Sequence, residues 1–166
     1  AKTLVASERF KKHRVIVLTH SWLNNKGERL KKSNYTLAPC NEPEDVWQKL
    51  IYPSENIVLV LSGHAGQAPE IKESVAATDY SPTSSFRVDK AANGREVFQM
   101  MFNSQQGDGD WNGNGGDCWL RILEFYPDGE TIGVRTFSPL FALSRVTAKF
   151  AWRTASYDQY DIKIKK

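Results

Sequence analysis

Two of the three histidines in this chain share a setting that suits metal binding. His20 follows an apolar run at 14–19, and His64 follows a second run at 57–61 through a short Ser-Gly step. An imidazole at the end of a strand can bind a metal through one nitrogen while a backbone carbonyl orients the other, so both are candidate ligands. Two imidazoles supply only half of a coordination sphere. His13 lies in a basic cluster and is interpreted as structural or solvated.

The elements expected to carry these histidines follow an α/β pattern. The runs at 14–19 and 57–61 are rich in β-branched residues, which is typical of strands buried on both faces in a parallel sheet. A helix is predicted from Pro43, because proline favours the first turn. A short amphipathic helix is expected within 1–12 and a long polar loop over 21–40. In such sheets ligands gather at the carboxyl ends of the strands, where both histidines fall.

The second half of the chain is expected to be antiparallel. Asn93-Gly94 predicts one hairpin, and the Pro-Asp-Gly turn at 127–129 predicts another. An alternating tail at 160–164 indicates an edge strand whose lysines discourage further pairing. The predicted fold class is therefore α/β, with two buried strands followed by antiparallel hairpins in one layered domain over 1–166.

Net charge, the length of apolar runs and the cysteine content limit the kinds of partner and compartment expected for this chain. The chain has 166 residues and a net charge of +3, and its basic residues are scattered, so no nucleic-acid surface is evident. No apolar run approaches the roughly 18 to 20 residues that span a bilayer, and no signal peptide is recognised. Cys40 and Cys118 form neither a disulfide framework nor a zinc cluster. The compartment stays open, an extracytoplasmic one included.

The sequence around both histidines resembles a known enzyme family. The segments VIVLTHSWL at 15–23 and NIVLVLSGHAG at 56–66 resemble the last two motifs of the calcineurin-like metallophosphoesterases. In that family a His ends one strand and a Gly-His-x-His segment ends the next. The resemblance continues, as in bacterial members, through GREVFQMMFNSQ, NGGDCWLRILEFYPDGETIGVRTFSP and AWRTASYDQYDI, and so covers nearly the whole chain.

This resemblance implies a phosphatase-like hydrolase with a four-layer α/β/β/α sandwich. Two divalent ions, about 3.5–4 Å apart, would activate a hydroxide for in-line attack on phosphorus in a phosphoester substrate. His20 and His64 match the family's two histidine ligands of the second metal. Zn, Mn and Fe all suit neutral imidazoles. Trp22, Gly66, Asn103 and Trp111 are candidate residues at the rim of the site.

Two departures from the family pattern limit what this chain would do alone. The second histidine of Gly-His-x-His, a ligand of the first metal, falls on Gly66. The family's Asp-x-His, Gly-Asp-x-x-Asp and Gly-Asn-His-Asp/Glu motifs have no counterpart in the chain. We therefore expect the C-terminal half of a phosphoesterase domain that is inactive alone, with the N-terminal half as partner. Uncovered sheet edges would favour self-association.

Two other interpretations remain open. The loop DGDWNGNGGD at 108–117 matches the first half of an EF-hand, but the twelfth position is Trp119 rather than glutamate. A non-catalytic β-rich binding module is the alternative from a different class. Ser62 precedes Gly-His without a nucleophile elbow. Trp47 and Trp119 are expected in the core.

Overall fold

The computed structural model describes residues 1–31, 39–65, 84–104 and 118–165. They form two compact units. The first comprises Ala1–Ala65 with Ser85–Met101, and the second Gly66–Ser84 with Phe102–Lys166. Helices and strands are mixed, and the strands form two sheets, as expected for a protein with α and β elements. No helix among the described residues is long and apolar enough to cross a membrane.

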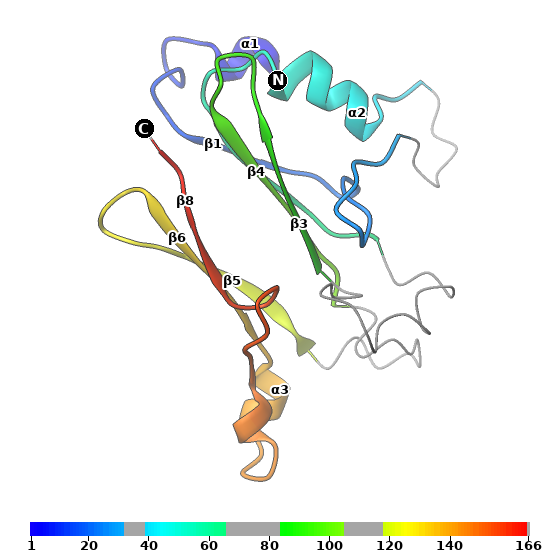
Figure 1. Cartoon of the computed structure of the whole chain (residues 1–166), viewed down its shortest axis with the longest axis vertical. Helices are drawn as coiled ribbons and strands as arrows, with labels where there is room; N and C mark the ends of the chain where they lie inside the picture. Colours follow the sequence, from blue (N-terminus) through cyan, green and yellow to red (C-terminus); the bar gives the residue numbers. More distant parts are fainter. Residues whose placement is uncertain (32–38, 66–83, 105–117, 166) are drawn as a thin grey trace. The chain divides into compact units, whose positions relative to one another are not determined.

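The first unit is built on a sheet with the strand order β1-β2-β4-β3 (Figure 1). Its strands are β1 (Val15–Leu18), β2 (Ile57–Ser62), β3 (Ser84–Lys90) and β4 (Glu96–Phe102). β2 is central and runs parallel to both β1 and β4. The hairpin predicted at Asn93-Gly94 joins β3 to β4, with the Ala91 N–H donating to Arg95 O at 2.8 Å.

The place of this hairpin corrects one expectation. The second half of the chain was expected to be antiparallel throughout, but β4 continues the parallel part of the first sheet. Its central residues Val97–Met101 are buried. A strand buried on both faces suits a parallel neighbour as well as an antiparallel one, so the Asn-Gly turn alone could not assign the partner.

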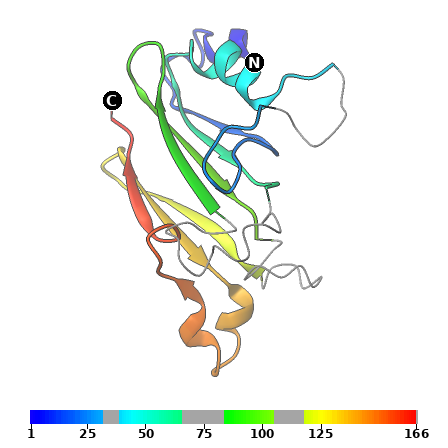
Figure 2. The ribbon, with the colours of Figure 1, turned by 45° about the vertical axis from the view of Figure 1, so that its right-hand side comes forward.

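The helices of this unit lie near one end of its strands (Figure 2), and the residues that follow α2 (Pro43–Val46) pack into the core with sheet residues. The helix predicted from Pro43 is α2, which continues as one π-helical turn over Trp47–Ile51. A capping box between Glu42 and Asp45 closes its first turn. Trp47 and Ile51 pack with Trp22, Leu23, Ile57, Val60, Ala91, Val97 and Met101 as the core of the unit. The first helix, α1, is only Lys2–Val5.

Only one of the two early strands is buried as predicted. Ile57–Val60 of β2 are buried, whereas side chains alternate along β1, with Ile16 40% and Leu18 81% exposed. The expectation that the run at 14–19 is buried on both faces is wrong. β1 is an edge strand of the described sheet, and its last residue, Leu18, is mostly exposed.

The second unit contains an antiparallel sheet with β6 at its centre. β5 (Leu120–Phe125) pairs with residues 132–137 of β6 (Thr131–Phe137), as the turn at 127–129 predicts. On the other side, β8 (Tyr160–Lys163) pairs with the first half of β6 and β7 (Trp152–Arg153) with the second half. Between β6 and β7 lie α3 (Pro139–Ala142) and a 3-10 turn at Ala148–Phe150.

Candidate metal site

The two candidate histidines come together at the carboxyl edge of the first sheet. β1 and β2 are parallel neighbours, and their pairing continues past both strands, because Thr19 N donates to Leu61 O at 3.0 Å and Gly63 N donates to His20 O at 3.1 Å. The imidazole rings follow, with centroids 4.7 Å apart and planes inclined by 49°. This proximity is the arrangement expected from the sequence, and it is far inside the roughly 10 Å beyond which two imidazoles cannot share a metal.

The backbone at His64 adopts a conformation that L-residues rarely take. Its φ is +63°, and the Ala65 N–H donates to Gly63 O at 2.7 Å, so His64 is the central residue of a γ-turn. The γ-turn with positive φ is rare and strained. Glycine would relieve that strain, yet the chain has histidine there. Strain of this kind gathers at functional sites, where the surrounding structure holds it in place.

The electrostatic setting favours neutral imidazole at His64. Partial burial lowers the pKa of His64 below its usual 6.5, and the neighbouring His20 lowers it further. Because a metal binds the neutral ring, a depressed pKa keeps the ligating lone pair available to lower pH. The Ser21 hydroxyl, directly after His20, is buried without a hydrogen-bond partner among the described residues. Such buried orphan groups are uncommon in folded proteins.

Trp22, predicted at the rim of the site, lies instead in the core. Its side chain is 1% exposed, and its indole N–H donates to the Oε1 of Gln99 on β4 at 3.0 Å. A buried indole needs a partner for its N–H, and a buried glutamine amide supplies it. Trp22 thereby ties the segment after His20 to the middle of the sheet. The predicted core positions of Trp47 and Trp119 are confirmed.

Gln99, itself buried, belongs to a polar cluster that also contains Arg29, Asp89, Glu44 and Arg87, which are only partly buried. Arg29 donates to Gln99 Oε1 at 3.1 Å and pairs with Asp89 at 2.5 Å and with Glu44 at 2.8 Å. Its guanidinium also lies 4.2 Å from the centre of the Trp47 ring. Burial would raise the pKa of Asp89, but hydrogen bonds from Arg87, Gln99 and Arg29 outweigh it and lower that pKa to about 2. Each charged group of the cluster is paired, which offsets the cost of its partial burial.

The remaining rim residues are placed only in part. Asn103 directly follows the end of β4 and is half-buried. Gly66, Trp111 and the loop at 108–117 lie outside the described residues, so the structure does not test the partial EF-hand match. His13, taken as structural, is exposed and packs edge-on against Phe10, with ring centroids 5.6 Å apart.

Within the described ranges, no group of three or more His, Cys, Asp or Glu side chains could hold a metal ion. The two histidines therefore fit half of a site. Cys40 and Cys118 are exposed free thiols. Sequence reasoning missed the polar cluster around Gln99. Its acidic and basic members are spread from position 29 to 89, and no local spacing links them.

Comparison of the chain with protein-family models, with curated proteins and with solved structures gives no significant match. The family resemblance rests on the sequence motifs alone.

Proposed function

We propose that His20 and His64 are two ligands of one divalent metal in a phosphoester hydrolase related to the calcineurin-like metallophosphoesterases. The observation that supports this most strongly is the meeting of the two rings, 4.7 Å apart, at the carboxyl edge of parallel neighbours. The strained γ-turn at His64 supports it further, because the fold tolerates a costly backbone to hold this side chain.

In the proposed site this chain supplies nitrogen ligands and their orientation. The backbone hydrogen bonds from Thr19 to Leu61 and from Gly63 to His20 hold the two strand ends side by side. The lowered pKa of His64 keeps that ring neutral near pH 7. Zn, Mn and Fe are the candidate ions for such ligands. When bound with a bridging carboxylate, divalent ions supply Lewis-acid activation of water and neutralise phosphate charge. The remaining ligands would come from outside the described residues, as from a complementing N-terminal half of the domain.

A binding module without catalysis gives no reason for two histidines to converge. In such a module, two adjacent surface imidazoles would repel each other when protonated, and their proximity would serve no function. The geometry therefore favours a metal site over that alternative.

The test is metal binding by the chain itself. Zn²⁺ or Mn²⁺ is titrated into the protein while the imidazole resonances are followed by NMR and the heat by calorimetry. We expect the resonances of His20 and His64 to respond together, with one site per chain. Either His20→Ala or His64→Ala should weaken binding at least about tenfold, since losing a ligand costs no less than losing an outer-shell partner.

His13→Ala is the matched control, because it removes an imidazole from the same unit but at the opposite end of β1 from His20, and it should leave binding unchanged. Binding that survives in both site variants, or that is lost equally in the control, would refute the shared site. Without the carboxylates the chain alone should not hydrolyse p-nitrophenyl phosphate, even with Mn²⁺ or Zn²⁺ present. Turnover by the chain that disappears in His64→Ala would show that its ligand set is already complete.

A further inference from the structure

The segment between β6 and β7 exposes an unusual density of large apolar side chains. Leu143 is 86% exposed and Val146 78%, and Leu140, Phe150 and Trp152 are each about half exposed. All five lie within fourteen residues of one another in sequence. Leu140 is on α3, Leu143 and Val146 lie between α3 and the 3-10 turn, Phe150 ends that turn and Trp152 begins β7. We call residues 139–152 the apolar lobe. Figure 1 shows α3 beyond the end of the strands of the second sheet.

The lobe is held in a defined conformation by hydrogen bonds and a ring contact, so the same apolar side chains are consistently exposed. Ser138 caps α3 by accepting from Phe141 N at 3.2 Å, and Ser138 N donates to Ala151 O at 2.8 Å across the base. Thr147 Oγ1 donates to Phe141 O at 2.8 Å. Phe141 packs edge-on against Trp119, with ring centroids 5.3 Å apart. One set of apolar side chains anchors the lobe, and a different set faces water.

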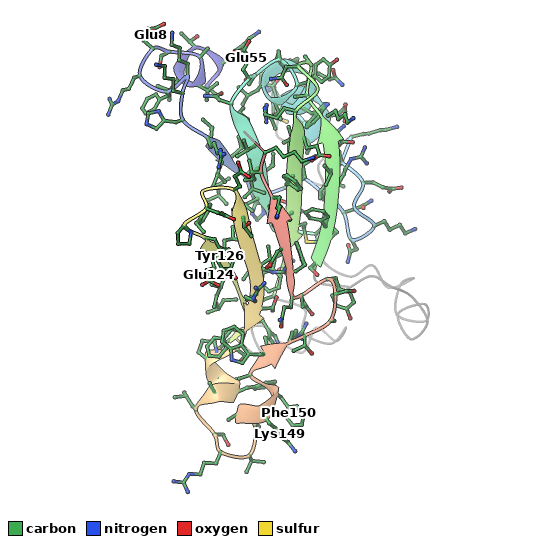
Figure 3. All side chains as sticks on the ribbon, turned by 60° about the vertical axis from the view of Figure 1, so that its left-hand side comes forward. Glu8, Glu55, Glu124, Tyr126, Lys149 and Phe150 are labelled. Carbon is green, nitrogen blue, oxygen red and sulfur yellow. The ribbon has the colours of Figure 1, made fainter. Side chains whose placement is uncertain are left out.

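The charges on the lobe have one sign. No acidic residue occurs between Glu130 and Asp158, whereas Arg145 and Lys149 are exposed within the lobe itself. Lys149 lies against the neighbouring Phe150, with its ammonium 4.8 Å from the ring centre, and both are labelled in Figure 3. Two further cations near the lobe are engaged elsewhere: Arg153 lies over Trp119, and Arg135 pairs with Asp161.

Apolar side chains interspersed with exposed cations complement an anionic lipid surface. Leucine, phenylalanine and tryptophan partition into the boundary between headgroups and acyl chains, while lysine and arginine contact the phosphates. A second copy of the chain would bring Arg145 and Lys149 against the same cations, which opposes a symmetric contact through this surface.

We propose that the apolar lobe docks the protein peripherally on anionic membranes. Leu143 and Val146 insert among the lipid chains, and Arg145 and Lys149 bind the headgroups. This inference is independent of the proposed metal site, because it rests on the second unit alone.

The experiment is co-sedimentation of the full chain with vesicles of phosphatidylcholine alone and of phosphatidylcholine with phosphatidylglycerol. We expect binding to the anionic vesicles, little to the neutral ones, and a decrease as salt rises. Leu143→Asp with Val146→Asp should abolish binding. Arg145→Gln with Lys149→Gln should weaken it by about fivefold per cation.

Leu4→Asp is the matched control for the apolar variants. Leu4 is 60% exposed on α1 of the first unit, and its substitution should leave vesicle binding unchanged. Circular dichroism confirms that each variant is folded. If the substitutions in the lobe leave vesicle binding unchanged, the proposal is overturned. A chain that binds no vesicles but forms dimers that Leu143→Asp dissociates also overturns it, because the occupant is then a second copy.

Discussion

At the scale of single residues, His64 combines a strained backbone conformation, with positive φ, and an imidazole ring that lies next to the ring of His20. Replacing it by glycine should separate these two properties. His64→Gly removes the penalty for positive φ and should stabilise the protein by about 1 kcal/mol, while it abolishes metal binding. His64→Ala keeps the Cβ and the strain, so it should lose metal binding without that gain.

Urea denaturation of the metal-free chain measures both variants. A His64→Gly protein that is less stable than His64→Ala would show that the γ-turn is not strained as its φ implies. The same position also gives a pH dependence. Since the pKa of His64 is lower in the folded state, the unfolded chain takes up the proton first, and stability should fall as pH drops below about 6.5. This part of the decline should be absent in His64→Gly.

Asp89 gives a second prediction at the residue scale. Its pKa of about 2, against 3.8 in an unfolded chain, means that its ion pairs add stability above pH 3.8. That contribution is lost as pH falls from 3.8 towards 2. Asp89→Asn should cost about 2 kcal/mol near pH 7, because Arg29 and Arg87 both lose their ion pair with the Asp89 carboxylate.

The cost of Asp89→Asn should shrink as pH approaches 2, where the native aspartate is itself protonated. Glu8→Gln is the control, since Glu8 pairs with Lys11 on an exposed turn and should show no measurable effect. An equal effect of the two substitutions across pH would contradict the central role assigned to Asp89 in the cluster.

At the scale of elements, the segment after His20 is fixed by a tight turn. Leu23 and Arg29 form an isolated antiparallel bridge, and Gly27 lies between them with a φ of +75°. A Cβ added to Gly27 would be 3.0 Å from the carbonyl oxygen of Phe86. Gly94 has the same backbone region, with a φ of +80°, but a Cβ there would meet nothing within 4 Å.

These two glycines form a matched pair. Gly94→Ala should cost about 1 kcal/mol, the usual penalty for an L-residue with positive φ. Gly27→Ala should cost more, because the turn must also move away from β3. Thermal unfolding of the two variants measures the difference. Equal costs would mean that the turn after His20 moves freely and does not fix the segment that follows the histidine.

At the scale of the whole molecule, β1 is the element that we expect to pair with another chain. It is an edge strand of the described sheet and contains only Val, Ile and Leu, without the charge or proline that usually protects an edge. Leu18 is its most exposed residue. We expect the purified chain to self-associate by pairing at this edge unless a complementing chain occupies it.

Leu18→Lys should restore a monomer, as measured by analytical ultracentrifugation, because a lysine at an edge discourages pairing. Leu4→Lys, at an equally apolar exposed position on α1, should leave the association unchanged. A wild-type chain that stays monomeric at high concentration would show that the β1 edge is protected.

The sequence by itself determined which segments form strands and turns, because those depend on local pattern. The apolar runs became β1 and β2, the Asn-Gly and Pro-Asp-Gly turns closed hairpins, and Pro43 began a helix. It also placed His20 and His64 at strand ends, and parallel strands bring such ends to one edge.

Only the tertiary structure decided which strands are neighbours and which faces are covered. β4 joined the parallel sheet, β1 became an edge, and Trp22 turned into the core to meet Gln99. The cluster of Arg29, Asp89 and Gln99 joins residues up to 70 positions apart. Contacts over such separations depend on how the chain closes its loops and packs its layers. The periodicity of apolar residues within a short window contains no information about either.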